Sequence, residues 1–537
     1  MDNKSKLISK IEREEATSFG KNVMMLAIAQ IVVKVLGLIY KIVIVNVPGF
    51  GNVGSGYYST GYQLYMVLLA VSSIGIPNVV SKLVSERVAI GDYKGAHKIF
   101  RVSFSMFTII GFVLALFMFV FAKPLSVLLF GAEGVAYTLM ALSPAVMFVS
   151  SNSILRGYFT GLGSLKSTSI SEIVEQIFNC LLSIGFVYMA IGSDTAIMAA
   201  AGNLSTTVAA LISLGYMCSH YLLRKKYLKI KCDSQETDSQ NIGTGKLIKT
   251  IAALAIPASF ASLVSSLSGN IDSITVNLYT GNVEAYGIMS KTETITHMPL
   301  ALGATLFIAM VPVVSALMQK EDHNGAQKNL TDTMFLSLVL MLPCAMGLSV
   351  LAQPILTLLY PTVSDGAILL QLQTIAMIFA AITFVLNGVF YGIGKQKYPA
   401  IILLIGALLK LVLNIVFLKL LNYGAVSAVV ATIIYQFIVM AIEMYCLNKF
   451  VPVRLNLINH IVKPIVSTFI MGGVVYASYM ITFKIIGNTL STLLSILIGI
   501  VIYFAMLIIL RTLNKEDYDK LPLGNKFYNI LKKFKLI

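Results

Sequence analysis

The chain has 537 residues, of which 57% are hydrophobic and only 12% are charged, whereas a soluble domain carries about 25% charged residues. This composition excludes a soluble globular protein. It predicts an all-α polytopic membrane protein, because the apolar runs have helix length, unlike the roughly 10-residue alternating segments of an outer-membrane barrel. The net charge of +16 lies in the loops, so the membrane surface explains it and no nucleic-acid partner is expected.

Fourteen apolar runs are long enough to cross a bilayer, which takes about 20 helical residues. We expect the crossings at 22–47, 57–81, 99–122, 136–160, 167–191, 196–223, 247–279, 285–318, 330–359, 367–394, 398–421, 424–448, 461–483 and 488–511. The first 21 residues are polar and lack the short apolar core and cleavage site of a signal peptide. We therefore expect the first crossing to be retained as an anchor.

The loops alternate in basic content. Most Lys and Arg residues lie in the N-terminus, the even-to-odd loops and the C-terminus, whereas the opposite loops hold only Lys123, Lys419 and Lys484. Because cytoplasmic loops carry the excess of positive charge, both termini and the polar linker at 224–246 are predicted to be cytoplasmic. The expected location is a cytoplasmic membrane.

Three motifs recur in order at an offset of 230 or 231 residues. Gly91–Lys98 resembles Glu321–Lys328, Ala122–Gly131 resembles Ala352–Pro361, and Gly157–Gly163 resembles Gly388–Gly394. Because each repeat holds an even number of crossings, both have the same orientation, which predicts two parallel six-helix lobes. The expected parts are an N-terminus at 1–21, an N-lobe at 22–223, the linker at 224–246, a C-lobe at 247–448, two extra helices at 449–511 and a basic tail at 512–537.

The first crossing carries polar residues on one face. Gln30, Lys34, Gly37 and Lys41 are spaced i, i+4, i+7 and i+11, which places them on a single helical stripe. A charge at bilayer depth costs at least roughly 2.5–3.5 kcal/mol on the insertion scale. Lys34 lies near the midplane, so it is expected to line a cavity or to meet a structural partner. Lys41 lies close enough to the outer interface to reach it.

Two further groups of charges lie in the seventh and eighth crossings. The repeat offset places Asp272 opposite Lys41, either as an outer gate pair or as a solvated carboxylate at the interface. In the next crossing, Glu293 and His297 share a face at i and i+4, and Lys291 points elsewhere. These residues are read as gate or ion-coupling candidates, with internal salt bridging as the alternative.

An aromatic stripe follows in the second crossing, where Tyr58, Tyr62 and Tyr65 are spaced i, i+4 and i+7. It is read as packing or an aromatic belt, and Tyr62 as a residue of the cleft. The five cysteines have no CxxC spacing, and no Walker A, HExxH or GxSxG motif occurs. We therefore expect no enzyme activity, no metal site and no cofactor.

Several motifs together resemble a known family. The stretches Tyr57–Tyr65, Gly75–Glu86, Leu155–Gly163 and Ser169–Gln176 are similar to the stage V sporulation protein B-like branch of the multidrug/oligosaccharidyl-lipid/polysaccharide exporter superfamily, a branch related to the lipid II flippases. The resemblance covers nearly the whole chain. It implies a V-shaped pair of six-helix lobes, alternating access, and two extra helices that form a groove for a polyprenyl tail.

The first-helix signature of lipid II flippases has a basic residue, then Leu-Gly, then a second basic residue. Lys34-Val-Leu-Gly37 matches its first part, so the resemblance implies that Lys34 contacts a pyrophosphate. The second basic position falls on Tyr40, and Lys41 comes one residue later, which turns a helix face by about 100°. The expected substrate-binding residues are Lys34, Lys41, Gln30 and Tyr62.

The function implied is a flippase of peptidoglycan or other polysaccharide biosynthesis, which moves a polyprenyl-pyrophosphate-linked precursor such as lipid II from the inner to the outer leaflet. The alternatives are a flippase for another lipid-linked oligosaccharide, a cation-coupled multidrug exporter, and a non-transporting scaffold for spore or envelope assembly. Expected partners are the lipid-linked glycan and membrane lipids, with cell-wall or spore-envelope proteins left open. Coupling to the membrane potential or to a monovalent cation is also left open.

Overall fold

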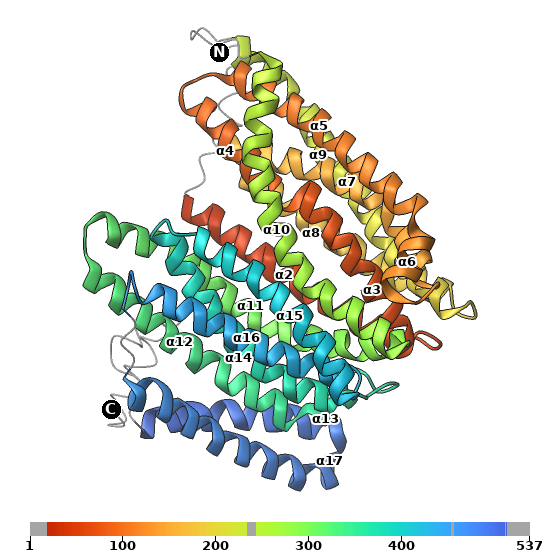
Figure 1. Ribbon diagram of the computed structural model, residues 1–537, viewed down its shortest axis with the longest axis vertical. Coiled ribbons are helices and arrows are strands. Elements are labelled where there is room, and N and C mark those ends of the chain that lie inside the picture. Colours follow the sequence, from red (N-terminus) through yellow and green to blue (C-terminus); the bar gives the residue numbers. More distant parts are fainter. Residues whose placement is uncertain (1–18, 234–242, 453–455, 511, 513–537) are drawn as a thin grey trace. The chain divides into compact units, whose positions relative to one another are not determined.

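The computed structural model describes residues 19–233, 243–452, 456–510 and 512. Within these ranges every regular element is helical. The predicted all-α membrane fold is therefore confirmed at this level (Figure 1). The expected N-terminal segment at 1–21 and basic tail at 512–537 lie almost entirely outside the described residues, and so does part of the 224–246 linker.

The chain divides into two compact units, which meet in sequence between Gly287 and Ile288. Helices of the first unit are α2 (Phe19–Val45), α3 (Gly51–Leu69), the π-helical turn η1 (Ala70–Ile74), α4 (Ile76–Ala89), α5 (Tyr93–Val120), α6 (Ala122–Phe130), α7 (Val135–Gly161), α8 (Leu165–Met189), α9 (Thr195–Asp233) and α10 (Thr244–Thr280). The second unit holds most of α11 (Val283–Gln319), then α12 (His323–Val350), α13 (Ala352–Leu359), α14 (Ala367–Gly392), α15 (Lys397–Leu421), α16 (Ala425–Leu447), the π-helical turn η2 (Leu457–Val462) and α17 (Lys463–Ile509).

Eleven helices of the described chain are long and apolar enough to cross a membrane. One of them includes α17, which has 47 residues; at 1.5 Å per residue it would measure about 70 Å, more than twice the hydrocarbon thickness. It bends back at Gly487, whose φ is 73°, and its two arms lie together in Figure 1. The Ser478 hydroxyl donates to the Ser495 hydroxyl between the arms at 3.0 Å. The expected count of fourteen crossings stays a prediction.

The repeated motifs have matching local structure. Asp92 caps α5 by accepting a hydrogen bond from the Gly95 amide at 2.8 Å, and Asp322 caps α12 by accepting one from Gly325 at the same distance. Such an aspartate accepts a hydrogen bond from the backbone amide three residues later. This bond satisfies one of the N–H groups that have no partner at the start of a helix. The six-helix repeat itself stays a prediction. The boundary of the compact units differs from the expected lobe boundary, because α10 packs against helices of the first lobe.

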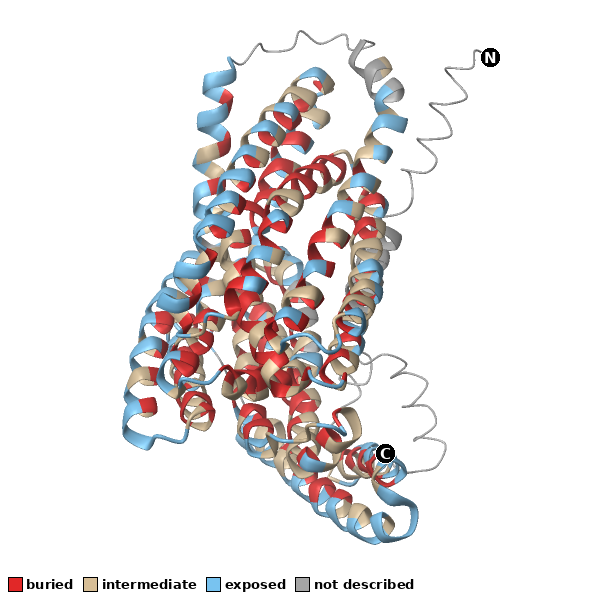
Figure 2. Ribbon diagram, turned by 90° about the vertical axis from the view of Figure 1, so that its right-hand side faces the viewer, coloured by how far each residue is buried: buried red, intermediate tan, exposed pale blue. Residues whose placement is uncertain are grey.

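Large apolar side chains are exposed along α5. They are Ile109, Phe112, Val113, Leu116, Phe117, Phe119 and Val120. Figure 2 shows exposed residues along the outward faces of many helices and buried residues where helices pack. A contiguous apolar surface of this kind is unusual on a soluble protein. Such an apolar surface is expected on a helix that faces lipid.

Candidate functional site

The α2 helix lies along α8 in the first unit. At their contact, Gly37 leaves room for the Gln176 side chain, whose Nε2 would lie 3.6 Å from a Cβ at that position. Lys34, one turn before Gly37, is exposed. Among the residues that the structure describes, no hydrogen bond or ion pair involves its ammonium group. Lys41 is half-buried, and the side chain of Gln30 lies outside the described residues.

A ladder of four tyrosines joins α2 to α3. The hydroxyl oxygens of Tyr40 and Tyr58 are 3.2 Å apart. The Tyr58 and Tyr62 rings are stacked with centroids 6.4 Å apart, and the Tyr62 and Tyr65 centroids are 5.5 Å apart. The sequence reading found the stripe on α3 but missed Tyr40, which is buried. Tyr40, at the position where the family resemblance implies a second basic residue, packs against Tyr58.

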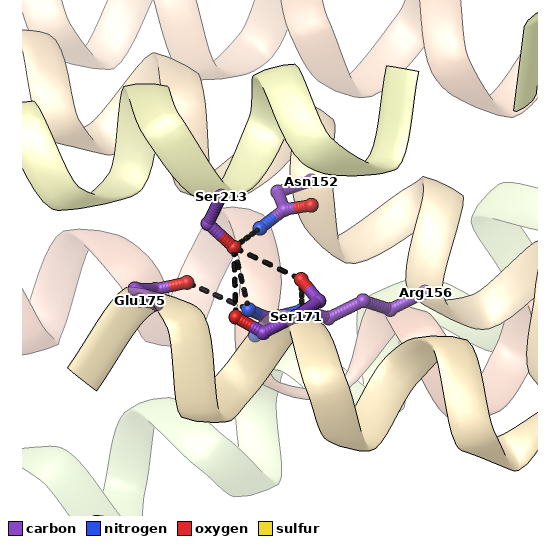
Figure 3. Close-up of polar contacts among 5 residues, drawn as sticks. All are labelled: Asn152, Arg156, Ser171, Glu175 and Ser213. Carbon is purple, nitrogen blue, oxygen red and sulfur yellow. Dashed lines mark hydrogen bonds and ion pairs between the residues drawn. The ribbon is translucent and has the colours of Figure 1, made fainter. Parts of the chain in front are cut away.

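A polar network ties three helices of the first unit together (Figure 3). The Arg156 guanidinium on α7 contacts the Glu175 carboxylate on α8 at 2.6 Å. It also donates to the hydroxyls of Ser171 on α8 and Ser213 on α9, each at 3.1 Å. Asn152, one turn before Arg156, donates to the same Ser213 hydroxyl at 2.8 Å. The network therefore fixes the three helices at one level.

The Arg156–Glu175 pair is shielded from solvent, with side-chain exposures of 17% and 26%. A shielded ion pair is costly to break, because removal of one partner leaves an uncompensated charge. The sequence analysis did not single out Arg156, although an arginine inside an apolar run is itself a signal.

Polar side chains also join α10 to α3. The Asn277 amide donates to the Thr60 hydroxyl at 2.9 Å, and the Asn270 amide donates to the backbone oxygen of Gln63 at 2.9 Å. Toward the other end of α10, the Ser259 hydroxyl donates to the Val71 carbonyl at 3.0 Å. These bonds run along α10 on one side and along α3 and the following η1 turn on the other, which places α10 against the second crossing.

Beyond the end of α10, glycines bring the backbones of α3 and of the start of α11 into direct contact. A Cβ on Gly56 of α3 would overlap the Val283 carbonyl, and a Cβ on Gly287 would overlap the Asn52 carbonyl. Only glycine permits such close approach of backbone to backbone. The Ser55 hydroxyl adds a bond to the Gly287 carbonyl at 3.3 Å. We call this group of contacting residues the α3–α10 seam; it consists of Asn52, Ser55, Gly56, Thr60, Asn277, Val283 and Gly287.

Asp272 belongs to α10 and is buried, with 3% of its surface exposed. It lies two residues from Asn270, which bonds to α3. Its pairing with Lys41, expected from the repeat offset, stays a prediction.

The charged residues of α11 have different environments. Lys291 is buried, donates to the Val363 carbonyl at 2.6 Å, and lies 5.3 Å from the centre of the Tyr360 ring. It therefore fastens the loop between α13 and α14 to α11. Glu293 is half-buried and His297 is exposed. The gate or ion-coupling role considered for these three residues stays a prediction.

Two family models match the chain. The model described as polysaccharide biosynthesis protein matches residues 19–318, and the model described as lipid II flippase MurJ matches residues 221–494. Each covers more than half of the chain.

Curated relatives are similar over most of their length. The lipid II flippase MurJ of Bacillus subtilis (strain 168) is 24% identical over 433 residues, which are 75% of this chain and 79% of that protein. Stage V sporulation protein B of the same organism is 23% identical over 522 residues, which are 94% of this chain and 98% of that protein.

Solved structures show the same fold. The lipid II flippase MurJ in an inward closed conformation has a TM-score of 0.70 at 17% identity and covers 90% of this chain and 98% of its own. An inward-facing multidrug resistance MATE family transporter of the MOP superfamily has a TM-score of 0.65 at 14% identity and covers 80% and 98%. The relatives named for an activity are flippases and transporters. The chain is therefore a multi-span membrane protein that belongs to the polysaccharide biosynthesis protein and lipid II flippase MurJ families.

Proposed function

We propose that this protein moves a polyprenyl-pyrophosphate-linked cell-wall precursor, most simply lipid II, from the inner to the outer leaflet of a bacterial cytoplasmic membrane. The observation that carries the proposal is the exposed Lys34 ammonium on α2. It is supported by the Lys34-Val-Leu-Gly37 match to the flippase signature and by membership of the family.

The chemistry of such a substrate explains the need for a cation. A diphosphate cannot enter hydrocarbon without a partner, because an isolated buried charge is very costly. A lysine near the middle of a crossing offsets part of that cost while the polyprenyl tail stays in lipid. A lysine binds phosphate as a point charge, without the bidentate geometry of arginine. The membrane potential, negative inside, favours outward movement of the anion.

The transport cycle that we propose is alternating access by two six-helix lobes. In this cycle the α3–α10 seam is the closed outer side, and it parts to release the head group. Both termini are cytoplasmic in the proposed orientation. The two arms of α17 lie beyond the repeats and are available to hold the tail.

A reconstituted flipping assay tests the proposal. Full-length protein in vesicles is supplied with lipid II or with another polyprenyl-linked sugar, and the arrival of each head group at the opposite leaflet is measured. We expect lipid II to move faster than in protein-free vesicles, and Lys34→Ala to abolish the gain. Lys82→Ala is the matched control, because the Lys82 side chain is exposed and pairs only weakly with Glu86 at 3.9 Å.

The outcomes separate the alternatives. Movement of the other sugar alone would assign the protein to a different lipid-linked glycan. Failure of both substrates, with the protein folded in the vesicles, would contradict the flippase proposal.

A further inference from the structure

The second unit contains a buried carboxyl group that the proposed function does not use. Glu443 on α16 has 2% of its surface exposed. Its Oε2 atom has no hydrogen-bond partner in the described part of the chain. Acidic residues within membrane crossings are rare and usually functional, so this carboxyl group needs a physical explanation.

Asn387 on α14 is its neighbour. The Asn387 side chain lies within hydrogen-bonding reach of the Glu443 carboxyl group. Its own Oδ1 atom is buried and has no partner among the described residues. The two helices are aligned by a second contact, in which Gln436 of α16 donates to the Thr383 hydroxyl of α14 at 3.5 Å. One amide donor therefore serves a carboxyl group that could accept several hydrogen bonds.

Apolar side chains surround this pair. Leu447 lies one turn beyond Glu443, and Leu386 and Phe390 flank Asn387; all three are fully buried. They belong to one cluster, which also contains Met310, Val314, Leu330, Met334, Leu338, Ile382, Val385, Val389 and Val451. The faces that α11 and α12 contribute to this cluster are therefore apolar.

Few charged or titratable groups approach the pair. The sequence of α14 contains no Asp, Glu, Lys, Arg or His, and its one titratable side chain, Tyr391, is exposed. On α15, Lys410 is directed at the Tyr435 ring of α16 with its Nζ 5.5 Å from the ring centre. Tyr435 lies eight residues before Glu443, which is about 12 Å along a helix.

The remaining groups lie at the helix ends. Lys395, before α15, lies over the Phe450 ring, and Lys449, after α16, lies over the Tyr445 ring. Tyr398 of α15 stacks on Phe390. Cys446 of α16 packs both against the apolar cluster around the pair and against Ile402 and Val439, and it is a neutral thiol neighbour of the pair.

This environment disfavours a negative charge for two reasons. Desolvation penalises an ionised carboxylate that has no cationic partner, and such a group becomes neutral by taking up a proton. Glu443 also lies in the last turns of α16, where the helix dipole is negative and repels an anion. Three side-chain oxygens are too few for a hard cation, which takes about six oxygen ligands. The donor set therefore favours a proton.

We propose that Glu443 and Asn387 form a proton-binding site at the contact between α14 and α16. The protonated carboxyl group fits the dry contact, with its O–H able to donate to the Asn387 Oδ1 atom. Loss of the proton creates a charge that needs water, so the ends of α14 and α16 must separate. Glu443 lies four residues from the end of α16, about 6 Å, so the path for the proton is short.

The step from proton site to transport rests on the proposed function, for which the proton would then be the coupling ion. The site itself is tested without any substrate. Infrared difference spectra of the full-length protein in vesicles, recorded between acidic and alkaline pH, distinguish the carbonyl stretch of a buried protonated acid from the bands of a carboxylate. We expect an acid band that persists at neutral pH in the unmodified protein and is absent in Glu443→Gln.

Two further variants complete the test. Glu133→Gln is the matched control, because the Glu133 side chain is 73% exposed; it should leave the acid band unchanged. Asn387→Leu keeps the carboxyl group but removes the amide beside it, so the band should move toward the position of an acid with fewer hydrogen bonds. If Glu443→Gln does not fold, the Asn387→Leu variant still tests the site.

A band that survives in Glu443→Gln, or that does not move in Asn387→Leu, would overturn the site. If the protein flips no lipid-linked sugar but the band behaves as expected, the proposed function fails and the proton site stands. If flipping by the unmodified protein depends on pH and that dependence is lost in Glu443→Gln, the proton is the coupling ion.

Discussion

The Asn277 amide nitrogen lies 2.9 Å from the Thr60 hydroxyl oxygen, which joins α10 to α3 at a buried position. The two residues are 217 positions apart in the chain. Together with the backbone contact at Gly56, this bond makes the α3–α10 seam a closure with little tolerance for added volume. Packed interfaces of this kind have discrete closed and open states.

Gly56→Val should weaken this closure. Its side chain would overlap the Val283 carbonyl, and overpacking costs about 1–3 kcal/mol, which lowers the ratio of closed to open protein roughly 5- to 150-fold. Cysteines at Thr60 and Asn277 should crosslink readily in the unmodified background and far less in Gly56→Val. Gly185→Val on α8 is the control, because its added side chain would meet open space. Equal crosslinking in the two valine variants would show that the α3–α10 seam accommodates the added side chain without opening.

Loss of Arg156 should destabilise the first unit. Arg156→Met leaves Glu175 shielded without its cation, so we expect a loss of about 2–3 kcal/mol, below the roughly 3–5 kcal/mol of a fully buried pair. The double variant Arg156→Met with Glu175→Gln should lose less than the sum of the single variants. Unfolding of the purified protein in detergent measures these differences. Lys123→Met is the comparison, since the exposed pair of Lys123 and Glu133 should contribute under about 1 kcal/mol; strict additivity would rule out direct coupling between Arg156 and Glu175.

Lys34 should be required for transport and not for folding. Lys34→Ala should abolish flipping and leave the melting temperature unchanged, Lys34→Arg should retain activity because the charge is kept, and Lys34→Glu should be the worst because it places an anion beside a diphosphate. The measurements are growth of a strain depleted of its own flippase and thermal stability of the purified protein. Growth supported by Lys34→Ala at normal expression would show that this residue does not carry the substrate. A structural salt bridge predicts instead a lower melting temperature, rescued by removal of the acidic partner.

Lys41 and Asp272 should approach each other when the outer side is closed. Asp272 is buried on α10 and Lys41 is half-buried on α2, so cysteines at both positions should form a crosslink that arrests transport until it is reduced. Crosslinking and flipping are measured on the same vesicles. Failure to crosslink, or full activity with the crosslink in place, would separate the two residues functionally.

The orientation of the chain is open to a direct test. A single cysteine placed in the 224–246 linker of a cysteine-free protein should react with a membrane-impermeant reagent only after the cells are opened, because the positive loops are expected on the cytoplasmic side. A cysteine at Lys123, in an opposite loop, should react in intact cells. Labelling of the linker from outside would invert the topology.

The sequence by itself determined the class of protein and much of its local structure. Composition and run length predicted a helical membrane protein, and the motif at Gly91–Lys98 predicted its counterpart at Glu321–Lys328, where Asp322 caps its helix as Asp92 does. These features depend on short-range chemistry, such as an aspartate three residues before a free amide, so neighbouring residues suffice to specify them.

Only the tertiary structure decided which face of each helix meets which partner. Tyr40 and Lys41 are adjacent in an apolar crossing, yet Tyr40 is buried against Tyr58 while Lys41 is half-buried. In a membrane, lipid and protein interior are equally apolar, so hydrophobic periodicity does not set the rotation of a helix about its axis. For the same reason, the sequence did not reveal that Arg156 contacts Glu175 or that Glu443 lies beside Asn387. Each pair joins different helices, and only the packing of those helices brings the two side chains together.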